Sequence, residues 1–99
     1  MENHTMEKKT NEVLLTVNEL AIMGAELNEM TNEIDLNNIT IDSLQLMKRK
    51  DPDYFMFIIS RYLNTTYAIN EKQFRKLDEI ACMLLNANDE KELEGFRNA

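Results

Sequence analysis

Turn-forming residues are scarce in this chain, because its 99 residues include only two glycines and one proline. A β-rich fold reverses direction every few residues and depends on such residues at its turns. The commonest hairpin dipeptides, Asn-Gly and Asp-Gly, do not occur anywhere in the sequence. The sequence therefore predicts an all-α fold, and we expect a small four- to five-helix bundle with a long N-terminal amphipathic helix.

The charge balance is acidic, with 18 acids against 11 bases and a net charge of −7. Such a surface repels a nucleic-acid backbone, which makes nucleic acid a disfavoured partner. The one dense basic cluster, at residues 48–50, is better explained as a solvated helix end. Hydrophobic residues make up 43% of the chain, which is a globular proportion. We therefore expect a single helical domain at residues 10–99, preceded by a flexible N-terminal tail at residues 1–9.

Residues that support catalysis or metal binding are few. The one histidine, His4, lies in the polar tail, and the one cysteine, Cys82, lies in an apolar run that suits a small buried thiol. A nucleophilic cysteine needs an activating base, and a zinc site needs several such ligands. We therefore expect no enzymatic activity, no cofactor and no metal.

The sequence contains no targeting or membrane-spanning signal. No apolar run approaches the ~18 residues that a membrane span requires, and no signal-peptide core follows the first residues. We therefore expect a cytoplasmic protein that has no membrane partner.

Apolar residues at steps of three and four predict the first two helices. The first should begin at Thr10 or Asn11, either of which can cap it, and extend to Ile34. Residues 35–38 read as a connection. A short second helix is expected at about 40–50, because Pro52 disfavours helical geometry in the residue before it.

Asp51-Pro52-Asp53 is a strong signal for the start of a third helix. Asp51 can cap the helix, Pro52 fits its first turn, and Asp53 complements the helix dipole. This helix should cover residues 52–64. It is apolar nearly all round, so we expect it to be the most buried of the helices. A fourth helix is expected after Asn70, and a short final one is expected to start at Asn88 or Asp89.

Four glutamates form a strict heptad row along the first predicted helix. With position a at Val13, the a and d positions form the predicted apolar face and include Leu20, Met23, Leu27, Met30 and Ile34. The g positions are Glu12, Glu19, Glu26 and Glu33. Charges at position g face the flank of a coiled-coil partner, so the row predicts a protein partner with a basic or amphipathic helical surface. Packing inside the chain explains the row as well, because acids commonly border the apolar face of a bundle helix.

Aromatic residues gather in the third predicted helix. Tyr54, Phe55, Phe57 and Tyr62 can form part of the core or a recognition surface. We take Tyr54, Phe55 and Tyr62, together with the four glutamates, as candidate partner-binding residues. If one side of this helix is exposed, a second copy of the chain could cover it, so a homodimer is an alternative.

The segment Ile41-Asp42-Ser43-Leu44 looks like the Asp-Ser-Leu attachment motif of acyl carrier proteins, a family of small, acidic, four-helical proteins. The resemblance covers about a dozen residues and implies that Ser43 carries a phosphopantetheine group. In the competing interpretation Asp42 and Ser43 are ordinary helix caps and Leu44 belongs to the core.

The sequence as a whole favours a small, non-enzymatic, acidic protein-binding module. It would act through the first helix, the aromatic third helix, or both, as adaptors, inhibitors, immunity proteins and chaperones do. The acyl carrier interpretation is the first alternative. A helical transcriptional regulator is the second, because the short second and third helices have the scale of a helix-turn-helix.

Overall fold

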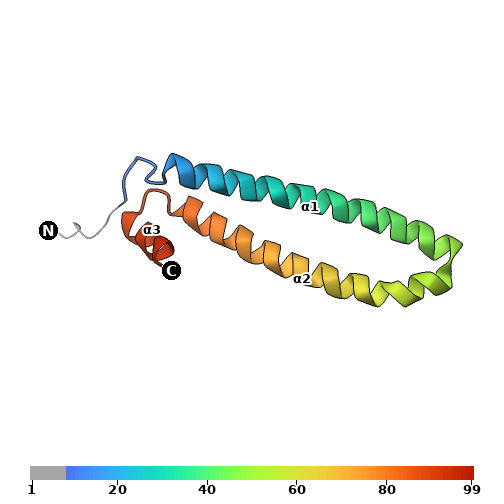
Figure 1. Cartoon of the computed structure of the whole chain (residues 1–99). Coiled ribbons are helices and arrows are strands. Elements are labelled where there is room, and N and C mark those ends of the chain that lie inside the picture. The colour runs from blue at the N-terminus through green and yellow to red at the C-terminus, as the bar shows by residue number, and fades with distance from the viewer. Residues whose placement is uncertain (1–8) are drawn as a thin grey trace. The chain divides into compact units, whose positions relative to one another are not determined.

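The computed structural model describes residues 9–99, so His4 and nearly all of the predicted tail at 1–9 lie outside the described residues. The described residues form three helices, α1 (Val17–Lys50), α2 (Pro52–Leu85) and α3 (Glu90–Arg97), and no strand (Figure 1). The all-α class is therefore confirmed. The prediction of a four- to five-helix bundle is wrong, because the chain forms fewer and longer helices.

The predicted helices merge because the polar segments between them do not interrupt the backbone. α1 continues through 35–38, and α2 continues through Asn64, Thr65 and Thr66. Asn and Thr cost only about 0.5–0.7 kcal/mol each inside a helix, far less than Pro does. The Thr40 hydroxyl, at the expected start of the second helix, instead donates to the Leu36 carbonyl at 3.0 Å, within α1.

The helix starts show which capping predictions are right. α1 begins later than predicted, because Thr16 and Glu19 form its capping box instead of Thr10 or Asn11. The Glu19 amide donates to Thr16 Oγ1 at 2.9 Å, and the Thr16 amide donates to Glu19 Oε1 at 2.8 Å. α2 starts as predicted, with the Tyr54 amide donating to Asp51 at 3.2 Å.

α3 also starts where the sequence predicts. Asp89 is its N-cap, and the Asp89 carboxylate accepts a hydrogen bond from the Glu92 amide at 3.2 Å. Capping by Asp is favoured because its side chain supplies an acceptor for an amide that has no partner within the helix.

The structure divides into two compact units, and both long helices contribute to each of them. The first unit holds the described residues up to Ala25 together with Lys76–Ala99, and the second is Glu26–Arg75. The prediction that residues 10–99 form a single domain stays a prediction.

The first unit is built around α3. Leu93 is fully buried there, and Leu15, Met23 and Ile80 are nearly so. Backbone hydrogen bonds attach the segment before α1 to the turn before α3. The Leu14 amide donates to the Ala87 carbonyl at 2.7 Å, and the Thr10 amide donates to the Asn88 carbonyl at 3.0 Å.

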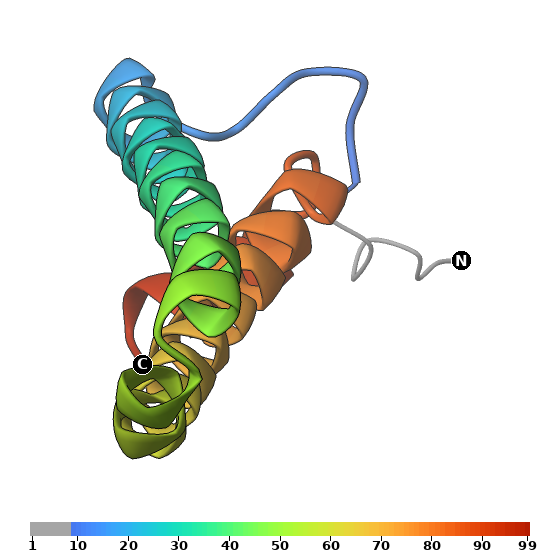
Figure 2. The ribbon, with the colours of Figure 1, turned by 90° about the vertical axis from the view of Figure 1, so that its right-hand side faces the viewer.

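The second unit is an antiparallel helix pair that reverses direction between α1 and α2, at the turn that faces the viewer in Figure 2. Met30 and Leu44 are its buried side chains. The prediction that residues 52–64 form the most buried helix is wrong, since Met56 is 68% and Phe57 is 77% exposed. With only two helices in the unit, α2 can turn only one side toward α1.

Candidate functional site

Three of the four glutamates in the row lie on α1, and Glu12 lies exposed before it. Glu19, Glu26 and Glu33 are each half-buried, alternating along the helix with the buried Met23 and Met30. Of the predicted apolar face, the d positions Met23 and Met30 are buried as expected, whereas the a positions Leu20, Leu27 and Ile34 are exposed. The inward side of α1 is therefore rotated by roughly 50°, one heptad position, from the predicted one.

Glu19 joins α3 to the start of α1. Arg97 Nε donates to Glu19 Oε2 at 2.8 Å, and a second guanidinium nitrogen donates to Oε1 at 2.9 Å. This paired geometry is the strong form of an Arg–carboxylate contact. The Arg97 guanidinium and the Thr16 amide lower the pKa of Glu19 to about 2. The Glu19 carboxylate in turn raises the pKa of Arg97. The pair fixes a helix end and is structural.

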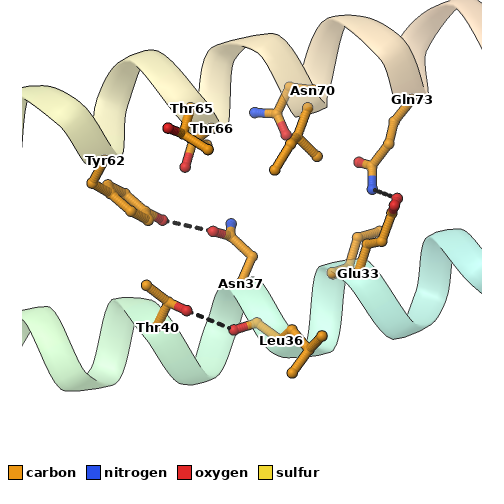
Figure 3. A pocket seen from close by; sticks show the side chains of 11 residues that line it. Glu33, Leu36, Asn37, Thr40, Tyr62, Thr65, Thr66, Asn70 and Gln73 are labelled. Carbon is orange, nitrogen blue, oxygen red and sulfur yellow. Dashed lines mark hydrogen bonds between the residues drawn. The ribbon is translucent and has the colours of Figure 1, made fainter.

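Glu33 belongs to a polar stretch of the seam in the second unit. Gln73 Nε2 donates to Glu33 Oε1 at 2.8 Å, and the Tyr62 hydroxyl donates to Asn37 Oδ1 at 2.7 Å (Figure 3). These pairs hold α1 and α2 together where large apolar side chains are missing. Each satisfies a part-buried polar group that would otherwise cost free energy.

A cavity of about 280 Å³ lies beside these hydrogen bonds. It is smaller than the ~300–1,000 Å³ of typical small-molecule pockets. Glu33 and Tyr62 are the ionisable residues among those that line it, and both side chains are already hydrogen-bonded. Five of the lining residues are the short Asn or Thr, which leave this space between the helices. The lining residues are Glu33, Ile34, Leu36, Asn37, Thr40, Tyr62, Thr65, Thr66, Ile69, Asn70 and Gln73.

Seven apolar residues on one side of the second unit are exposed, and we call them the apolar face. Each is between 36% and 68% exposed, and each directly follows a residue of the α1–α2 seam that is half-buried or lines the cavity. The positions between them carry neutral side chains, Thr31, Asn38, Ser60 and Asn70, which are also exposed. The apolar face consists of Leu27, Ile34, Ile41, Met56, Leu63, Tyr67 and Phe74.

The opposite side of the second unit carries charged side chains. Leu36 and Ile39 are exposed there on α1, but α2 contributes the cations Arg61, Lys72 and Arg75. The apolar face, by contrast, has no charged side chain among its seven members or at the four positions between them. The α2 half of the apolar face was missed in the sequence, although Met56 and Leu63, like Tyr67 and Phe74, are spaced seven residues apart.

Of the predicted binding residues, Glu33 and Tyr62 line the same cavity, and the others do not line it. Glu12 is exposed before the start of α1, and Glu19 lies in the first unit. Tyr54 is half-exposed and stacks on Phe57, with ring centroids 6.4 Å apart. Phe55 is half-buried, with the Lys48 ammonium 5.9 Å from its ring centre. The partner-binding role of these residues stays a prediction.

Ser43 lies inside α1 and is exposed, while its neighbour Leu44 is buried. The interpretation of Asp42 and Ser43 as helix caps is therefore wrong, although Leu44 does belong to the core. Attachment of phosphopantetheine to Ser43 stays a prediction. Cys82, for which we expected burial, is half-buried on α2.

Comparison of the chain with protein-family models, curated proteins and solved structures gave no match. Within residues 9–99, no helix combines the length and apolar character that crossing a membrane requires. The same residues contain no cluster of three or more His, Cys, Asp or Glu side chains suited to a metal ion.

Proposed function

We propose that this chain is a small non-enzymatic protein-binding module, of the adaptor, inhibitor, immunity or chaperone type, that binds through the apolar face. The exposure of this face is the observation that carries the proposal. Single exposed hydrophobic residues are normal on a folded protein, but contiguous apolar patches mark interaction sites. Here Tyr67 and Phe74 lie about two helical turns apart on one helix, and Leu27 and Ile34 are spaced in the same way on the other.

The apolar face supports this function better than the glutamate row does. Glu19 is engaged by Arg97 and Glu33 by Gln73, so both carboxylates already have partners within the chain. Binding a basic partner through them would first break these contacts. The apolar face requires no such exchange, and its aromatic residues are of the kind enriched at the centres of protein interfaces.

Site-specific photo-crosslinking in the source cell tests this proposal. Benzoylphenylalanine in place of Tyr67 would put the reactive group on the apolar face, and the same group in place of Phe57 provides a matched control. Phe57 is aromatic, exposed and on the same helix, but it lies off the apolar face. We expect a defined protein adduct from position 67 and none from position 57. Equal adducts from both positions, or none from either, would contradict the proposal.

A further inference from the structure

We propose that the apolar face binds a second copy of this chain, so that two helix pairs close into a four-helix interface around a two-fold axis. The inference rests on the proposed function, because it names the partner for the same surface. Three observations support it: the register of the helices, the distribution of charge and the shape of the face.

Two hydrogen bonds between α1 and α2 define the register of the second unit. The Tyr62–Asn37 and Gln73–Glu33 hydrogen bonds pair residues whose numbers add to 99 and 106. The same register puts Ile34 level with Tyr67, and Leu27 near the level of Phe74. The two halves of the apolar face therefore run alongside each other, not at opposite ends of the helix pair.

Both halves also lie on the same side. Each residue of the apolar face is one position after a seam residue, as Ile34 is after Glu33 and Phe74 is after Gln73. Each step along a helix turns by about 100° in the same sense when viewed from its own N-terminus. The two helices are antiparallel, so this turn carries the following residues of both helices to one side of the pair. The apolar face is thus one surface across two helices.

The distribution of charge favours a second copy over a basic partner. The apolar face and the positions between its members carry no charged side chain. With Glu19, Glu26 and Glu33 turned inward, the glutamate row does not oppose its copy across such an interface. A basic partner would find no carboxylate on this surface to pair with, whereas an uncharged surface loses little by packing against itself.

The shape of the face is also self-complementary. Its α2 half carries the large side chains of Tyr67 and Phe74, and the outer positions of its α1 half are the smaller Thr31 and Asn38. If α2 of one chain lies over α1 of its copy, large side chains meet small ones at both halves of a two-fold interface. A two-fold interface uses the same patch on both subunits, as this arrangement requires.

Sedimentation equilibrium of the purified full chain tests the inference. We expect a monomer–dimer equilibrium in the range of about 1–100 µM, and we expect Phe74→Glu to weaken dimerisation about a hundredfold or more. Phe57→Glu is the matched control. It makes the same substitution at a more exposed phenylalanine of α2 outside the apolar face, and it should change the dimer dissociation constant less than about threefold. Circular dichroism of both variants verifies that they remain helical.

The possible outcomes separate this inference from the proposed function. If the wild-type chain stays monomeric at all concentrations, the proposal that the apolar face binds a second copy is wrong. If position 67 still yields a protein adduct in the cell, the proposed function stands and the partner is another protein. A dimer that Phe57→Glu disrupts as strongly as Phe74→Glu also overturns the inference, because the interface would then lie outside the apolar face. A monomer with no adduct at position 67 contradicts both proposals.

Discussion

Glu19 has two structural roles at the start of α1, and both depend on its negative charge. It completes the capping box with Thr16, and it holds the Arg97 guanidinium through both of its oxygens. A carboxylate in the first turn of a helix also interacts favourably with the helix dipole. One side chain therefore both starts α1 and secures the end of α3.

The low pKa of Glu19 makes this contact sensitive to acid. The folded-state pKa is about 2, against 4.5 for the free side chain. Because the folded pKa is the lower one, the stabilisation is complete well above pH 4.5 and is lost as the pH falls toward 2. We expect the wild type to have a higher urea midpoint than Glu19→Gln at pH 7, and the gap should narrow from pH 4.5 to pH 2. The difference in urea midpoint between the wild type and Arg97→Gln should narrow in the same way. A difference that does not change with pH would contradict the prediction.

Leu93 is the fully buried side chain at the centre of the first unit. We expect Leu93→Ala to lower the free energy of unfolding by about 2–5 kcal/mol, because it removes apolar burial and leaves a cavity. Leu85→Ala makes the same substitution at a leucine that is 82% exposed, and it should change stability by less than about 0.5 kcal/mol. Urea denaturation measures both. Equal losses for the two variants would show that α3 does not supply the core of this unit.

At the scale of the element, the sequence predicts helix starts better than helix continuity. Asp51-Pro52 and Asp89 were identified correctly because an aspartate before a helix has a specific capping role. Asn and Thr have no such single meaning. They cap a helix when the preceding backbone is non-helical, and they otherwise fit inside a helix at small cost. The predicted breaks at 35–38 and 64–66 rested on these ambiguous residues.

Because of the same ambiguity, the α2 half of the apolar face was not predicted from the sequence. Met56 and Leu63 were assigned to one helix, and Phe74 to the next, so a row that crosses the predicted break could not be recognised. On α1, Leu27 and Ile34 were recognised as apolar heptad positions, but they were assigned to the buried side. That side depends on which face of α1 meets α2, and this is decided by tertiary contacts such as Gln73–Glu33.

Asn64 distinguishes a continuous α2 from a broken one by the sign of its effect. It is exposed inside α2, so Asn64→Ala should raise the free energy of unfolding by about 0.5 kcal/mol through better helix propensity. If Asn64 instead ended one helix or capped another, the same substitution would lower the free energy of unfolding. Asp51 is an observed cap, so Asp51→Ala should lower the free energy of unfolding by about 1 kcal/mol. Chemical denaturation of the three proteins decides between the two signs.

At the scale of the whole molecule, apolar residues are distributed unusually for a chain that folds alone. Among the described residues, six hydrophobic side chains are buried and twenty large ones are exposed. Burying a large apolar side chain contributes about 1.5–3 kcal/mol, and ordering each residue costs about 1–2 kcal/mol. Six such residues are a small core for this many ordered positions. Covering the apolar face with a second copy would add to it, so folding and association should be coupled.

Coupled folding predicts that stability depends on protein concentration. If a folded dimer unfolds to two free chains, each tenfold rise in concentration adds about 1.4 kcal/mol per dimer to the apparent stability. The urea midpoint should therefore rise with concentration for the wild type and for Phe57→Glu, and it should stay constant for Phe74→Glu. Added salt should raise the wild-type midpoint further, because it screens the repulsion between two chains of net charge −7. If a basic partner bound the glutamate row instead, added salt would weaken that binding, because it screens the attraction between opposite charges. A wild-type midpoint that does not change with concentration would show that the helix pair is stable with its apolar face uncovered.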